Sequence, residues 1–105
     1  MSRELVFLPE VSHDFAEGFN YYESLSPGRG GARFEASFKR ALQQVEAGVV
    51  THLQAFEHFH RVFVPRFPYN LYYRLVGNRA VVTGVLYARF DPARIEKILK
   101  SRTSR

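Results

Sequence analysis

The feature of the sequence that most constrains the fold is the dipeptide Gly77-Asn78, which stands between two runs rich in Val, Leu and Tyr. A two-residue Gly-Asn loop supplies the positive φ that the twist of a β-hairpin requires. The dipeptide therefore predicts two antiparallel strands with Val76 opposite Arg79. Pairing then continues as Leu75 with Ala80, Arg74 with Val81 and Tyr73 with Val82, and farther on as Tyr72 with Thr83, Leu71 with Gly84 and Asn70 with Val85.

This register divides the hairpin into two faces, because paired residues of an antiparallel sheet share a face. One face is mostly apolar and should meet the core. The other is predicted to be polar and basic, since it carries Asn70, Arg74 and Thr83 and, by continuation, Tyr87 and Arg89. The solvated side of an ordinary antiparallel sheet has the same pattern. The functional interpretation depends on the arginines, which stand without an acid between residues 59 and 90.

Two segments of the amino-terminal half have the apolar period of an amphipathic helix. The first helix is expected to run from a cap at Ser12 to about Leu25, and the second from Ala32 to a left-handed cap at Gly48. Their apolar stripes consist of Phe15, Phe19 and Tyr22 in the first helix and of Phe34, Phe38, Ala41, Leu42 and Val45 in the second. The Gly-rich residues 26–31 predict a turn, so the two helices should form an antiparallel hairpin.

The remaining segments complete the predicted chain order. Residues 4–8 predict a short strand stopped by Pro9, residues 49–58 a loop, and residues 92–100 a short helix. Residues 101–105 are expected to fray, and the acids near the amino terminus are expected on a solvated helix face: Glu10, Asp14, Glu17 and Glu23. We therefore predict one α+β domain over residues 1–105, a two-layer fold in the order βααβββ. In it a helical hairpin packs on an antiparallel meander, and a short helix ends the chain.

Positive charge is concentrated in the second half of a chain whose formal net charge is +5. Residues 1–58 hold five Lys/Arg against eight Asp/Glu, whereas residues 59–105 hold ten against two. A clustered positive field of this kind favours an anionic partner, either nucleic acid or an acidic protein segment.

The sequence lacks the features of membrane-spanning, secreted and metal-binding proteins. No apolar run approaches the roughly 18 residues of a membrane span, and the first residues lack the long apolar stretch of a signal peptide. We therefore expect a cytoplasmic protein with no membrane partner. The chain has no cysteine, and His52, His58 and His60 have only Glu57 as a nearby carboxylate. Neither a metal site nor a cofactor is expected.

Two stretches of the carboxy-terminal half resemble a known family. Residues 66–74 read Arg-Phe-Pro-Tyr-Asn-Leu-Tyr-Tyr-Arg, and residues 85–92, after the hairpin, read Val-Leu-Tyr-Ala-Arg-Phe-Asp-Pro. Together they resemble the RelE/ParE superfamily of toxins from bacterial type II toxin–antitoxin systems, and more closely its ParE-like plasmid-stabilisation branch. The second stretch departs in part from the family's pattern of His, any residue, Arg, Arg, Asp, Pro: Arg89 matches, while Tyr87 and Phe90 differ.

The resemblance implies a compact toxin that a small acidic cognate antitoxin neutralises, with two alternative activities. A ParE-like toxin would inhibit DNA gyrase by protein binding, and we favour this alternative because of the Phe-Pro-Tyr string and the closing Asp-Pro. A RelE-like toxin would be a ribosome-dependent mRNA endonuclease. A degenerate member of the family without toxicity is a third alternative, so whether the chain is an enzyme stays open.

The resemblance and the basic face together indicate which residues carry function. Target or anion binding is assigned to His60, Arg61, Arg66, Tyr72, Arg74 and Arg89. In a nuclease, arginines would stabilise the charged phosphoryl transition state and a tyrosine would assist proton transfer. The catalytic residues would then be Arg61, Arg74, Tyr87 and Arg89. Arg89 has a structural alternative, in which it bridges to Asp91 or to backbone carbonyls at the strand end.

Overall fold

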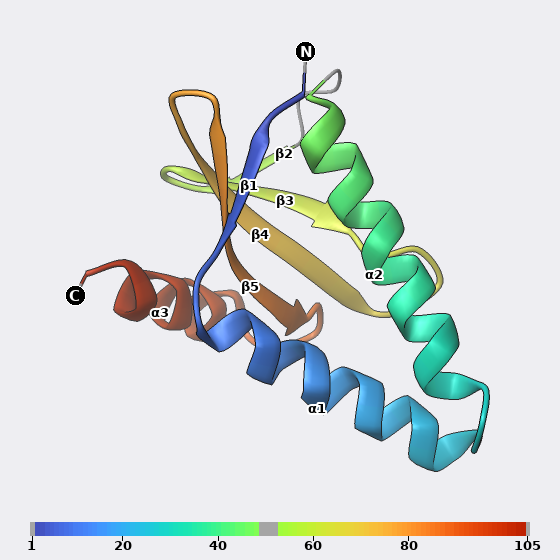
Figure 1. The fold of residues 1–105 in the computed structure, drawn as a ribbon. Coiled ribbons are helices and arrows are strands. Elements are labelled where there is room, and N and C mark those ends of the chain that lie inside the picture. The colour runs from blue at the N-terminus through green and yellow to red at the C-terminus, as the bar shows by residue number, and fades with distance from the viewer. Residues whose placement is uncertain (1, 49–52, 105) are drawn as a thin grey trace.

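The computed structural model describes residues 2–48 and 53–104, which form three helices and a five-stranded sheet (Figure 1). The elements follow in the order β1 (Glu4–Phe7), α1 (Glu10–Leu25), α2 (Gly30–Ala47), β2 (Leu53–Phe56), β3 (Phe59–Phe63), β4 (Tyr69–Val76), β5 (Arg79–Tyr87) and α3 (Pro92–Thr103). The strand order is β1-β5-β4-β3-β2, with β1 parallel to β5 and the other neighbours antiparallel. The predicted α+β class is confirmed.

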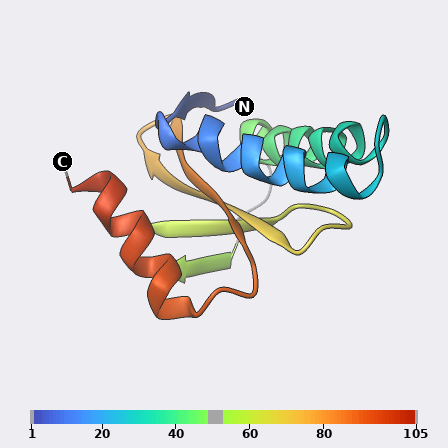
Figure 2. The same cartoon turned by 90° about the horizontal axis from the view of Figure 1, so that it is seen from below.

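Helices cover both faces of the sheet (Figure 2). The hairpin of α1 and α2 packs on one face, where Phe34 and Val45 of α2 meet Leu71 and Val82 of the central strands. On the other face lies α3, so the final helix adds a further layer to the predicted pair. The two hydrophobic clusters are separated by the sheet between them.

The hairpin of β4 and β5 begins as the sequence predicts. Gly77 has a φ of 60°, the left-handed conformation that the turn needs. From the turn outward, Val76 pairs with Arg79, and the next three pairs are Leu75 with Ala80, Arg74 with Val81 and Tyr73 with Val82. These four predicted pairs are confirmed.

A β-bulge at Thr83 shifts the pairing farther from the turn. Because β5 holds one extra residue there, Tyr72 lies opposite Gly84, and the next two pairs are Leu71 with Val85 and Asn70 with Leu86. The predicted pairs of Tyr72 with Thr83, Leu71 with Gly84 and Asn70 with Val85 are wrong by one residue. At the bulge α3 comes close: Arg102 donates to the Thr83 carbonyl at 3.1 Å, and a Cβ on Gly84 would lie 3.0 Å from the same guanidinium.

The face predicted to be polar and basic is instead covered by α3. Tyr72 is only 2% exposed, and Asn70 and Thr83 are buried as well. The hydrophobic cluster on this face consists of Phe59, Tyr72 and Leu86 from the sheet and of Ile95 and Leu99 from α3. The prediction fails because a polar pattern along a strand does not show which later element folds back over it.

The two edge strands, β1 and β2, differ in how well the sequence predicts them. β1 ends at Phe7 and pairs parallel with β5, with Leu5 opposite Ala80. The expectation of a loop over residues 49–58 is wrong for residues 53–56, which form β2 and pair with β3. That pairing is irregular between Gln54 and Phe56, and an interrupted register hides the two-residue period. Residues 49–52 lie outside the described residues.

Close packing of α1 against α2 depends on glycine at the facing positions. A Cβ on Gly31 would lie 2.5 Å from the ring of Phe19, and a Cβ on Gly18 would lie 2.5 Å from the ring of Phe34. The rings of Phe15 and Phe34 pack with their centroids 5.7 Å apart. The predicted helical hairpin is therefore held by its aromatic stripes.

The ends of these two helices match the sequence analysis except at one cap. α1 ends at Leu25, and α2 ends at Ala47 with Gly48 in the left-handed conformation, at a φ of 67°. The predicted cap at Ser12 is wrong, because α1 begins at Glu10 and the Ser12 hydroxyl donates to the Pro9 carbonyl at 3.0 Å. Ser12 therefore lies inside the first turn.

A buried ion pair ties α3 to α1. The Arg102 guanidinium donates from Nη1 to Oδ2 of Asp14 at 2.6 Å and from Nη2 to Oδ1 at 2.9 Å. The same carboxylate accepts the backbone N–H of Val85 at 3.0 Å. Two expectations are corrected: Asp14 lies in the interior, and α3 continues to Thr103 through residues predicted to fray.

Candidate functional site

The structure distributes the predicted site residues over several places. Arg74 lies opposite Val81 near the hairpin turn, whereas Tyr87 ends β5 and Arg89 lies exposed in the turn after it. The six residue steps along β5 from Val81 to Tyr87 correspond to about 20 Å. The expectation that Arg74 lies near Tyr87 and Arg89 is therefore wrong.

Arg61 and Tyr72 do come together, as a pair across β3 and β4. Burial raises the pKa of the Tyr72 hydroxyl, and a hydrogen bond with Asn70 and the charge of Arg61 oppose that rise. A tyrosine this deeply buried packs the interior beneath α3 and is poorly placed to exchange protons with a substrate. On the opposite face, the ring of His60 stacks on Tyr73 with the centroids 5.3 Å apart.

Tyr87 belongs to an aromatic cluster at the far end of the hairpin. Its ring packs edge-on against Tyr69 at 5.8 Å and against Phe90 at 5.5 Å. The guanidinium of Arg94 lies 4.0 Å from the centre of the Phe90 ring. Burial raises the pKa of Tyr69. These contacts give Tyr87 a packing role between α1 and the turn that leads into α3.

The outer side of α3 and the turn before it form a basic surface. Its exposed cations are Arg89, Arg94, Lys97 and Lys100. Glu96 pairs with Lys100 at 2.9 Å and neutralises part of this charge. Of the two arginines assigned to the polar sheet face, Arg89 lies on this outer surface, where the clustered charge can steer and contact a negatively charged partner, whereas Arg74 lies near the hairpin turn.

An apolar groove lies beside the edge strand β1 and was missed in the sequence analysis. It has a volume of about 390 Å³ and is lined by Phe7, Leu8, Pro9, Val11, Ser12, Phe15, Phe38 and Leu42. Phe7 is 47% exposed. The sequence does carry one signal for this groove, because Phe7 is a large apolar residue at the end of a short strand. An apolar groove next to a free strand edge is suited to an amphipathic helix or an added strand.

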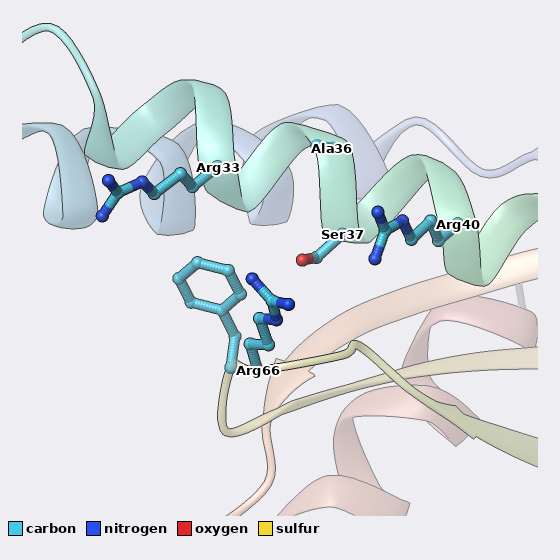
Figure 3. A pocket seen from close by; sticks show the side chains of 6 residues that line it. Arg33, Ala36, Ser37, Arg40 and Arg66 are labelled. Atoms are coloured by element: carbon cyan, nitrogen blue, oxygen red, sulfur yellow. The ribbon is translucent and has the colours of Figure 1, made fainter.

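Arg66 lies in the loop between β3 and β4, away from the other predicted site residues. With Arg33 and Arg40 of α2 it lines a hollow of about 540 Å³ between the helix and the loop (Figure 3). Arg33 and Arg40 carry no sign of this cluster in the sequence, because Arg66 is far from them along the chain and only the fold brings the three together.

Within residues 2–48 and 53–104, no group of three or more His, Cys, Asp or Glu side chains could hold a metal ion. Of the three histidines considered, His52 lies outside the described residues and His58 contacts Glu57 at 3.2 Å. In the same part of the chain, no helix combines the length and apolar character needed to cross a bilayer.

Comparison with known proteins gives a match among solved structures. No protein-family model and no curated protein matches the sequence. Among solved structures, a chain described as "Chromosomal ParDE TA system from P. aeruginosa" superposes with a TM-score of 0.66 at 13% sequence identity. The match covers 84% of this chain and 98% of that chain. The protein therefore has the fold of a chain from a ParDE toxin–antitoxin system.

Proposed function

We propose that this protein is the toxin of a bacterial type II toxin–antitoxin module of the plasmid-stabilisation kind, and that it acts by binding its target. The observation that carries the proposal is the fold shared with the ParDE chain over 84% of the present chain. The Phe-Pro-Tyr string at residues 67–69 and the Asp-Pro at residues 91–92 support the same branch.

We assign the antitoxin to the groove beside β1. The groove is apolar, and Phe7 at its rim is 47% exposed. β1 is an edge strand, so its outer backbone groups are available to a strand of a partner. A small antitoxin that covered this groove and approached the basic half of the chain would be acidic and amphipathic.

We assign the target to the class of DNA gyrase, bound as a protein and without chemistry by the toxin. The separation of Arg89 from the neighbouring Arg61 and Arg74 supports binding over nuclease catalysis, because transition-state stabilisation needs its donors around one reacting group. The basic outer surface of α3 is the contact region that we propose. The toxin would act in the cytoplasm, where both partners occur, and would need no cofactor.

The antitoxin assignment is tested with Phe7→Ser in cells that co-express the neighbouring reading frame. We expect the antitoxin to bind this variant about tenfold more weakly, since burying a large aromatic side chain against a partner is worth more than about 1 kcal/mol. Co-purification and cell growth are the measurements. The matched control is Val76→Ser, which changes a residue that is 52% exposed at the hairpin turn. Equal binding of both variants would place the antitoxin elsewhere, and a neighbouring frame that yields no partner would contradict the proposed function.

A further inference from the structure

Three arginines from two distant parts of the chain meet at one hollow. Arg33, Ser37 and Arg40 lie along one stripe of α2, spaced by four and three residues, and Arg66 comes from the loop between β3 and β4. Figure 3 shows Arg66 extending from the loop toward α2, with Ser37 above it and Arg33 and Arg40 on either side along the helix. The hollow has a volume of about 540 Å³.

The charge in this hollow is not neutralised by the described part of the chain. None of the residues that line it is acidic. Across residues 2–48 and 53–104, no ion pair joins Arg33, Arg40 or Arg66 to a carboxylate. The nearest acid in the helix, Glu35, pairs with Lys39 at 3.4 Å. The hollow therefore presents three positive charges to an external ligand.

The loop holds Arg66 in place by a backbone conformation that few side chains adopt. Arg66 has a φ of 70°, which is uncommon for a residue with a Cβ. Beside it, the backbone N–H of Phe67 donates to the Val64 carbonyl at 3.2 Å, and the Phe67 ring packs edge-on against Tyr22 at 4.6 Å. A loop fixed in this way sets the point from which the exposed Arg66 side chain extends toward α2.

The spacing of the arginines indicates the kind of anion that fits. Seven helical residues separate Arg33 from Arg40, about 10 Å along the axis. A row of arginines spread over that length matches consecutive phosphate groups better than it matches a single carboxylate. Guanidinium groups form paired hydrogen bonds to phosphate oxygens. The Ser37 hydroxyl, in a residue that is only 5% exposed, adds a polar group between the two helix arginines.

We propose that Arg33, Arg40 and Arg66 form a binding site for a ligand that carries consecutive phosphate groups, either a nucleic-acid strand or a small polyphosphate. The site lies on α2 and the β3–β4 loop and uses neither the groove beside β1 nor the outer surface of α3. It therefore does not depend on the proposed antitoxin or target.

The test measures binding of two probes to the isolated full-length chain. The probes are fluorescein-labelled decathymidylate, followed by anisotropy, and inorganic tripolyphosphate, followed by calorimetry. The double variant Arg33→Gln/Arg40→Gln and the variant Arg66→Gly remove the charges, and glycine tolerates the φ of 70° at that position. The control Lys39→Gln/Arg79→Gln removes two positive charges from exposed positions that lie outside the hollow and outside the basic surface of α3.

We expect at least about a tenfold loss of affinity in the double variant and in Arg66→Gly, and much less in the control. For decathymidylate, three phosphate contacts predict that the logarithm of the association constant changes with the logarithm of the salt concentration with a slope of about −2. The double variant keeps one contact, so its slope should be shallower, about −0.7. If only decathymidylate binds in a way that depends on the arginines, the ligand is a nucleic-acid strand. If only tripolyphosphate does so, the ligand is a small polyphosphate. Either result supports the site.

Three results would overturn the site: no binding of either probe, an equal loss of affinity in the control variant, or equally tight binding of a ten-residue polyglutamate peptide. Failure of the antitoxin experiment leaves this test unaffected, because no antitoxin is present in it.

Discussion

Asp14 joins three elements, since it lies in α1 and its carboxylate bonds to Arg102 of α3 and to the backbone of β5. Removing one partner of a buried pair leaves the other charge without compensation, at a cost of about 3 to 5 kcal/mol. We therefore expect Asp14→Asn to lower the free energy of unfolding by roughly 3 kcal/mol in urea titrations.

The matched control for Asp14→Asn is Glu96→Gln, which breaks the exposed pair between Glu96 and Lys100. Exposed pairs of this kind contribute about 0 to 1 kcal/mol. If the two variants lose similar amounts of stability, the buried pair does not have the structural role described above.

Glu23 gives the fold a dependence on pH. Its carboxylate accepts the backbone N–H groups of Gly28 at 2.5 Å and Gly31 at 3.0 Å, and these bonds hold the pKa of Glu23 below its usual value. A depressed pKa in the folded state means that the contribution to stability is complete above the unfolded pKa of about 4.3 and is lost as pH falls through the folded pKa.

We therefore expect Glu23→Gln to melt at a lower temperature than the wild type at pH 7, with the difference in Tm closing below about pH 4. Thermal melts of both proteins at several pH values measure this difference. A difference that stays constant across the range would show that the turn after α1 does not depend on the ionised carboxylate.

At the scale of elements, the end of α3 is the segment whose removal is most informative. A chain that stops after Ser101 loses Arg102, and we expect its free energy of unfolding to be lower by roughly 3 kcal/mol. A chain that stops after Thr103 keeps the pair with Asp14 and should match the full-length protein in urea titrations. Combining the shorter chain with Asp14→Asn should add little, because both changes remove the same contact. Equal stability of the two truncated chains would show that the tail is dispensable.

Elements that depend on local signals are the ones the sequence predicts. Gly77 and Gly48 mark a turn and a helix end because both need a left-handed backbone, and the aromatic stripes of α1 and α2 follow a helical period. The bulge at Thr83 and the strand at residues 53–56 depend on partners elsewhere in the chain. Nothing in their own neighbourhood reveals them. The polar pattern on the sheet face beneath α3 likewise gives no sign that a later helix covers it.

At the scale of the whole molecule, the candidate site residues illustrate the same limit. Residue types and family resemblance identify Arg61, Arg66 and Arg89 as cations of interest, yet their mutual distances follow only from the folded sheet. The fold keeps Arg89 apart from Arg61 and Arg74, because most of the length of β5 lies between them. It also brings Arg66 to Arg33 and Arg40, which the chain order keeps apart. Sequence reasoning therefore predicts the kind of chemistry better than its location.

The measurement that tests the central claim most directly compares two activities of the purified wild-type protein. One assay follows supercoiling by DNA gyrase, and the other follows cleavage of mRNA on translating ribosomes. A toxin that acts by protein binding should inhibit supercoiling and leave the mRNA intact, and addition of its antitoxin should restore supercoiling. The opposite result, ribosome-dependent cleavage that disappears in Arg89→Ala while supercoiling is unaffected, would contradict the proposal.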